Sequence, residues 1–162
     1  MTSDEVTFRP IGVIRTPFER PEGMPVQPMA ARGVRGTIEL DPAYIEGLAD
    51  LEGFSHLTLL YHFHRVGESR LTVVPFLDDR AHGIFATRSP ARPNPIGLST
   101  VRLVGISGST LEIEDVDILD GTPLLDMKPY VAPLDDRPGA RIGWYEGRLA
   151  DIENARADDR FR

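Results

Sequence analysis

The chain has 162 residues, a formal net charge of −7 and no cysteine. This length suits a single domain, and the lack of cysteine excludes a disulfide framework and a thiolate zinc site. The start of the chain, Met1 to Phe8, has no apolar run, and no stretch approaches the ~20 apolar residues of a membrane helix. We therefore expect a cytoplasmic protein, away from membranes. Because its net charge is −7, it would bind a polyanion only through a local basic patch.

Proline and glycine separate short segments whose apolar residues alternate with period two, a pattern typical of strands joined by turns. Strands are predicted over 6–16, 34–40 and 56–65, with an irregular proline-rich loop over 17–31. One helix is predicted from Asp41, a good N-cap followed by Pro42, to Gly53, which can close the helix. Its apolar residues would share one face: Tyr44, Leu48 and Leu51.

Further strands are expected in the second half of the chain, over 71–76, 83–87, 96–106, 111–119 and 125–131. A turn at Ser107-Gly108-Ser109 joins two of them. Residues 150–162 are expected to form a polar tail or a short helix, outside a core of about 6–147 in one domain over 1–162. The fold class is therefore mainly β: a small antiparallel β-barrel of about seven strands with one or two short helices.

The most unusual run is Gly83 to Thr100, GIFATRSPARPNPIGLST. It carries Arg88 and Arg92 and no acidic residue, which makes a local cationic site in an acidic protein. Three prolines stiffen the run, so that less conformational freedom is lost on binding. Two guanidinium groups on a stiff loop suit a carboxylate or a phosphate. The alternative is that both arginines pair with the nearby acidic strand and the prolines only shape a turn.

The second notable run is Asp120 to Val131, DGTPLLDMKPYV, which opens with a turn signal. Such a turn can expose backbone amides and carbonyls to a ligand, and Asp126 and Tyr130 are candidate proton acceptors, although an ordinary hairpin fits the same residues. The acidic residues around this run match no calcium loop, and we expect them on a solvated strand face. These residues are Glu112, Glu114, Asp115, Asp117, Asp120 and Asp126.

The histidines offer a different reading. His62 and His64 lie two apart on a predicted strand, so their side chains would share a face, as in a two-histidine metal site. A third ligand would have to come from His56, His82 or a carboxylate. A histidine pair on a polar strand face also occurs without metal, so we expect no metal ligand and place His64 and Arg65 on the rim of a pocket instead.

Several stretches together resemble one family. They are IGVIRTPF at Ile11 to Phe18, the Pro25/Gln27-Pro28 loop, GFSHLTLLYHFHR at Gly53 to Arg65, GIFATRSPARPNPIGLS at Gly83 to Ser99, and DGTPLLDMKPY at Asp120 to Tyr130. The chain resembles the TsaA-like (YaeB-like) family of S-adenosylmethionine-binding proteins from about Val6 to Trp144. Val26 stands where many relatives have arginine, Arg65 where they have glutamine, and Ala91 where they have phenylalanine.

The resemblance implies a methyltransferase built on a small β-barrel, a homodimer, and S-adenosylmethionine as cofactor. It implies methylation of the nitrogen of threonylcarbamoyl-adenosine beside the tRNA anticodon. The implied cofactor contacts are Pro25, Val26, Gln27, His64, Arg65, Arg88, Leu98, Asp120, Gly121, Thr122 and Pro123. Two other functions stay open: a module that binds the cofactor or RNA without turnover, and a metal-dependent barrel enzyme that uses His62 and His64.

Overall fold

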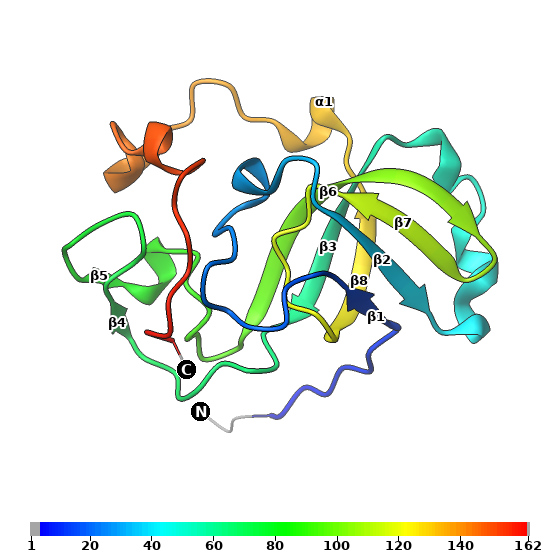
Figure 1. Ribbon diagram of the computed structural model, residues 1–162, viewed down its shortest axis with the longest axis horizontal. Coiled ribbons are helices and arrows are strands. Elements are labelled where there is room, and N and C mark those ends of the chain that lie inside the picture. Colours follow the sequence, from blue (N-terminus) through cyan, green and yellow to red (C-terminus); the bar gives the residue numbers. More distant parts are fainter. Residues whose placement is uncertain (1–3, 162) are drawn as a thin grey trace.

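The computed structural model describes residues 4–161 and shows a β-barrel with an irregular region beside it (Figure 1). The strands are β1 (Gly12–Arg15), β2 (Arg35–Leu40), β3 (His56–His62), β4 (Thr72–Val73), β5 (His82–Gly83), β6 (Ile96–Ser107), β7 (Thr110–Glu114) and β8 (Thr122–Pro129). The helical segments in this range are α1 (Ala132–Asp135) and 3-10 turns at Pro28–Ala31, Pro42–Leu48, Leu51–Gly53, Ile84–Ala86, Gly143–Tyr145 and Leu149–Asp151.

The barrel strands follow the order β1-β2-β7-β6-β3-β8, and β8 pairs with β1 to close the ring. Every pair in this ring is antiparallel. The predicted antiparallel barrel is confirmed, with six strands in the ring where about seven were expected. The two short strands β4 and β5 form a separate ribbon, because Pro75 follows β4 and a 3-10 turn follows β5.

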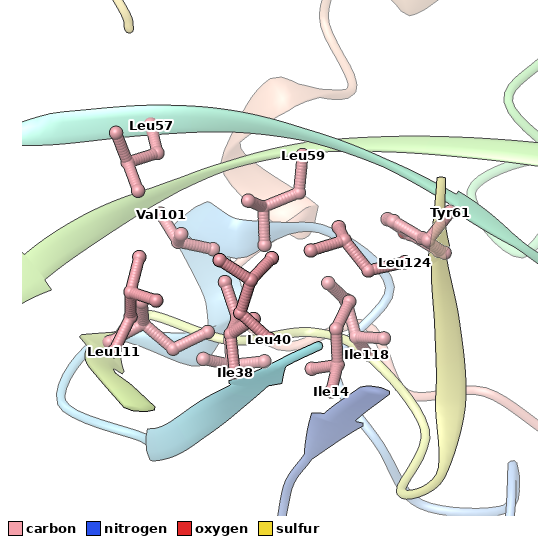
Figure 2. Packing of buried hydrophobic residues seen from close by; sticks show 12 residues of the cluster. Ile14, Ile38, Leu40, Leu57, Leu59, Tyr61, Val101, Leu111, Ile118 and Leu124 are labelled. Carbon is pink, nitrogen blue, oxygen red and sulfur yellow. The ribbon is translucent and has the colours of Figure 1, made fainter. Parts of the chain in front are cut away.

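Apolar side chains fill the inside of the barrel (Figure 2). In β3, Leu57, Leu59 and Tyr61 are buried, as the period of two in the sequence predicted. The described part of this core cluster comprises Ile14, Ile38, Leu40, Leu57, Leu59, Tyr61, Val101, Leu111, Ile113, Val116, Ile118 and Leu124. Because each buried aliphatic side chain contributes about 1.5–3 kcal/mol, this cluster dominates the stability of the barrel.

The predicted helix at 41–53 is wrong in type, because the segment forms two 3-10 turns. It does begin as expected, with the Asp41 carboxylate accepting a hydrogen bond from the backbone N–H of Ala43 at 2.9 Å. Gly47 weakens the helical tendency, and Asp50 adopts a left-handed backbone with φ of +66°, which interrupts the segment. Consequently Leu48 packs against the core, while Tyr44 is left exposed.

Residues 153–161 return to the irregular region beside the barrel (Figure 1). Ala157 exchanges backbone hydrogen bonds with the 21–27 loop, donating to Met24 at 2.9 Å and accepting from Gly23 at 2.7 Å. The Phe161 ring packs edge-on against Phe76, with their centroids 5.2 Å apart. The segment is therefore held at its middle and at its C-terminal end by residues distant in sequence. Among residues 4–161, no helix is long and apolar enough to cross a membrane.

Candidate functional site

A cavity of about 440 Å³ lies between the β3–β6 side of the barrel and the irregular region. This volume is within the range of pockets that enclose small organic ligands. Aromatic rings supply much of the lining: Tyr61, Phe63, Phe76, Trp144, Tyr145 and Phe161. The polar and charged side chains among them include His64, Arg65, Arg88, Asp117 and Asp158. Flat apolar walls with a few charged groups suit a ligand that is aromatic at one end and ionic at the other.

Arg92 fixes the shape of the arginine-rich loop. Its Nη1 atom donates to three backbone carbonyls of the same loop, those of Ile84, Thr87 and Ser89, at 3.1, 2.8 and 3.3 Å. The guanidinium also lies 5.9 Å from the ring centroid of Phe85. Arg92 therefore acts inside the protein, where its hydrogen bonds hold the bent backbone of the loop together.

Arg88, in contrast, lines the cavity, and its guanidinium group is not paired with a carboxylate among residues 4–161. Its Nη1 atom lies 3.4 Å from Oε1 of Gln27, a long hydrogen bond to a neutral group. Within residues 4–161, neither Arg88 nor Arg92 forms an ion pair, so the alternative in which both pair with the acidic strand is wrong. Arg88 is thus suited to bind an anionic group of a ligand.

The 25–27 loop forms a second wall. Pro25, Val26 and Gln27 line the cavity, and Pro25 forms a bridge with Arg156 of the C-terminal segment. From that segment, Ala157, Asp158 and Phe161 complete the wall. The Asp158 carboxylate is bound by Arg160 at 2.6 Å, which lowers its pKa.

A third wall comes from the end of β3 and the start of β8. His64 and Arg65 follow β3, and the Nδ1 atom of His64 lies 3.4 Å from the Thr122 hydroxyl. Burial lowers the pKa of His64, as do the charges of Arg65 and His62, so this imidazole is neutral at pH 7. Leu98, half-exposed on β6, also lines the cavity.

The other predicted contacts at the Asp120-Gly121 turn lie outside the cavity lining. Asp120 accepts a hydrogen bond from the backbone N–H of Thr16 at 3.1 Å. Gly121, with φ of +75°, donates to the carbonyl of Ile14 at 2.9 Å, and Pro123 pairs with Val13 in the sheet. These three residues attach β8 to β1, so their contribution to the cavity is to place Thr122.

A hydrogen-bonded relay runs from the barrel interior to the cavity. Ser99 Oγ donates to Oδ1 of Asp117 at 2.7 Å, and the Tyr61 hydroxyl lies 2.9 Å from the same Ser99 oxygen. Because the single Ser99 proton is donated to Asp117, Tyr61 is the donor in its bond to Ser99. Burial raises the pKa of Asp117 to about 6, although the bond from Ser99 and the charge of Arg88 oppose this.

Asp126 and Tyr130, the proton acceptors suggested by the sequence, are not in the cavity lining. Asp126 pairs with Lys128 at 2.9 Å on β8, and the Tyr130 hydroxyl donates to Asp136. His62 is exposed and is also absent from the lining, whereas His64 is present. No group of three or more His, Asp and Glu side chains within residues 4–161 could hold a metal ion, so the described residues do not support the metal-dependent alternative.

Sequence reasoning missed two parts of the site. The first is Asp117, expected on a solvated strand face but directed into the cavity from the loop after β7. No local signal marked it, because a polar residue between the apolar Val116 and Ile118 is typical of a solvated strand position. The second is the pair of C-terminal segments that supply Trp144, Tyr145 and Phe161. Only the aromatic residues in an otherwise polar stretch could have indicated this wall.

A closed antiparallel barrel with one aromatic and ionic cavity defines the class of the protein: a β-barrel that binds a small ligand outside its core. The sequence matches the tRNA-methyltransferase O N-terminal domain over residues 13–136, and the chain belongs to this family. A probable S-adenosyl-L-methionine-binding protein of Pyrococcus abyssi is 54% identical over 156 residues, which are 96% of this chain and 85% of that protein.

Two longer relatives carry more specific names. The tRNA (adenine(37)-N6)-methyltransferase of Escherichia coli K12 is 39% identical over 153 residues, which are 88% of this chain and 65% of the enzyme. The crystal structure of TrmO from Pseudomonas aeruginosa matches with a TM-score of 0.74 at 40% identity, over 87% of this chain and 63% of that one. This chain thus spans less than two thirds of these two proteins.

Proposed function

We propose that the chain binds S-adenosylmethionine in the cavity and methylates the exocyclic nitrogen of threonylcarbamoyl-adenosine beside the tRNA anticodon. The observation that carries this proposal is the meeting of the arginine-rich loop, the 25–27 loop, the end of β3 and Thr122 around one cavity. These segments contain most of the contacts that the family resemblance implied. The names of the Pyrococcus and Escherichia coli relatives support the cofactor and the substrate class. We also propose a cytoplasmic location, because a tRNA substrate would be met there.

The chemistry of the lining fits this cofactor. The ring of Phe63 offers a flat surface for an adenine, and Arg88 can pair with the carboxylate of the amino-acid moiety. Trp144 stacks on His82 and Tyr145 and closes the wall beside it. When bound, the cofactor supplies a methyl group on a sulfonium. The protein's own part is to align donor and acceptor and to exclude water, which the aromatic walls provide.

Arg88→Ala is expected to weaken S-adenosylmethionine binding by about 1–3 kcal/mol, or roughly 5- to 150-fold, because a charge-assisted bond is lost. Isothermal titration on the purified chain measures this change. Arg137→Ala is the matched control, since Arg137 is exposed, donates to nearby carbonyls and lies outside the cavity. Equal affinities for both variants, or no heat with the unmodified protein, would contradict the proposed site.

Methyl transfer separates an enzyme from a module that only binds. With labelled S-adenosylmethionine, the proposed enzyme labels bulk tRNA taken from a strain that lacks this methylation, and nucleoside mass spectrometry locates the methyl group. A protein that binds the cofactor but leaves the tRNA unlabelled would support the alternative without turnover.

We further propose that the protein is a homodimer, as the family resemblance implied. Phe85, Ile96 and Leu98 expose apolar side chains near the cavity, and a second copy of the chain could cover this surface. Sedimentation equilibrium is expected to give twice the chain mass of 18.0 kDa. A monomer at the highest concentrations used would contradict this proposal.

A further inference from the structure

We propose that Asp117 is the catalytic base that accepts the proton of the target nitrogen during methyl transfer. This inference rests on the proposed function and names the residue that would perform its proton-transfer step. The acceptor nitrogen lies between a purine and a carbamoyl group, so its lone pair is delocalised. Methylation therefore requires that its proton be removed as the new bond forms.

Asp117 is placed for this role by its surroundings. Two carboxylates line the cavity within residues 4–161, those of Asp117 and Asp158. Arg160 holds Asp158 in an ion pair, whereas Asp117 has only the neutral Ser99 hydroxyl as its side-chain hydrogen-bond partner. Asp117 therefore keeps an oxygen available to a ligand proton.

The relay behind Asp117 fixes its orientation. Tyr61 and Ser99 belong to the paired strands β3 and β6, and their hydroxyls end in the bond to Oδ1 of Asp117. Tyr61 stays protonated because burial raises its pKa, as does the nearby Asp117 charge, so it acts as a permanent donor. Ser99 and Tyr61 are thus positioning residues, and their relay uses only Oδ1 of Asp117.

The step balances as follows. The proton leaves the acceptor nitrogen for an oxygen of Asp117, and the nitrogen electron pair forms the bond to the methyl carbon. The bond from that carbon to sulfur breaks, and its electron pair stays on the sulfur. The proton on Asp117 passes to solvent after the products leave. A base with a pKa of about 6 is charged at neutral pH and yet releases the proton readily.

Several groups set the charge on Asp117. Ser99 and Arg88 favour the carboxylate form, and burial opposes it. The other titratable or charged side chains that line the cavity are Tyr61, His64, Arg65, Arg92, Tyr145 and Asp158. His64 is the competing base because its imidazole is neutral. The Thr122 hydroxyl donates its proton to the Leu119 carbonyl, so Nδ1 of His64 faces Thr122 as the donor and Nε2 is the acceptor nitrogen. Variants at Asp117 and His64 therefore decide between the two bases.

The test compares Asp117→Asn with Asp126→Asn in single-turnover methylation of unmethylated tRNA between pH 5 and 8. Asp117→Asn is expected to slow transfer by roughly 100- to 10,000-fold and to change the dissociation constant for S-adenosylmethionine by less than about threefold. The unmodified rate is expected to fall about tenfold per pH unit below the pKa of Asp117, because the protonated acid cannot accept a proton. Asp126→Asn should match the unmodified protein, since Asp126 lies outside the cavity.

Two further measurements need no turnover. The Asp117 pKa lies above that of an unfolded aspartate, so the folded state binds the extra proton and loses stability as the pH rises through about 6. Asp117→Asn is therefore expected to raise the melting temperature at pH 8 and to leave it unchanged near pH 4. Ser99→Ala removes a bond that favours the carboxylate, so the Asp117 carboxyl titration seen by NMR should shift to higher pH.

The outcomes separate the two proposals. If the unmodified protein binds no S-adenosylmethionine or labels no tRNA, the proposed function fails and the role of Asp117 fails with it. If transfer occurs but Asp117→Asn keeps the unmodified rate, only the role of Asp117 is overturned. A large loss of cofactor affinity in Asp117→Asn would make Asp117 a cofactor ligand instead. A different result would assign the base to His64. The fall of the methylation rate at low pH would then be absent in His64→Gln and still present in Asp117→Asn.

Discussion

Gly97→Ala is expected to destabilise the protein by about 2–4 kcal/mol, because overpacking a filled site costs roughly 1–3 kcal/mol and a displaced hydrogen bond adds about 1. A Cβ atom on Gly97 would lie 2.2 Å from Cε2 of Tyr61 and 2.4 Å from its Cζ. The ring cannot move aside easily, since it is 5% exposed and packs edge-on against Phe63. Urea unfolding of the two proteins measures the difference.

Gly105→Ala is the matched control on the same strand. A Cβ atom on Gly105 would meet nothing within 4 Å, so its effect on stability should be within about 0.5 kcal/mol. A double-mutant cycle then identifies the cause. In a Tyr61→Leu background the clashing ring is gone, and Gly97→Ala should cost much less than it does alone. A Gly97→Ala protein as stable as the unmodified one would show that the strand can shift at this point.

Ending the chain after Ile152 is expected to weaken S-adenosylmethionine binding about a hundredfold, or roughly 2.7 kcal/mol, because the ligand would lose one wall of its pocket. The deletion removes Ala157, Asp158 and Phe161 from the cavity lining. Isothermal titration measures the affinity, and Phe161→Ala in the full chain should show a smaller loss in the same direction.

The barrel itself should survive this deletion. Its buried core lies between Ile14 and Leu124, so none of these side chains is removed, and the buried Ile152 is kept. We expect a melting temperature within a few degrees of the unmodified protein. Equal affinity in the shortened chain would show that the C-terminal wall does not contact the ligand, whereas an unfolded product would show that this segment stabilises the barrel.

The barrel could be predicted because its strands and turns are determined by residues that are neighbours in the sequence. The alternation in His56–His62 places Leu57, Leu59 and Tyr61 in the core, and the two-residue turn around Gly108 joins β6 to β7. The alternation of apolar residues and the residue types of the turn are both visible in the sequence, without knowledge of the partner strand. The failed helix at 41–53 shows the limit, because an apolar spacing of i, i+4 and i+7 does not reveal the left-handed Asp50.

The site was predicted only in part, because its completion depends on contacts between distant segments. Arg88 was identified from a stiff, unusual loop and Gln27 through the family resemblance. In the structure, Nη1 of Arg88 lies 3.4 Å from Oε1 of Gln27. The burial of Asp117 results from the packing of a loop against β6. Its acidic neighbours in the sequence instead predicted a solvated strand face. The role of Phe161 depends on Phe76, some eighty residues earlier in the chain.

The pairing of Ala157 with the 21–27 loop has a consequence for biosynthesis. All six strands of the ring have been made once the ribosome has added Pro129, so the barrel can form before the pocket exists. The pocket closes only after Phe161 has emerged, and a ligand stabilises only a state that it can bind. Cellular S-adenosylmethionine therefore cannot assist the early folding of the nascent chain, and it can protect only the finished protein from proteolysis.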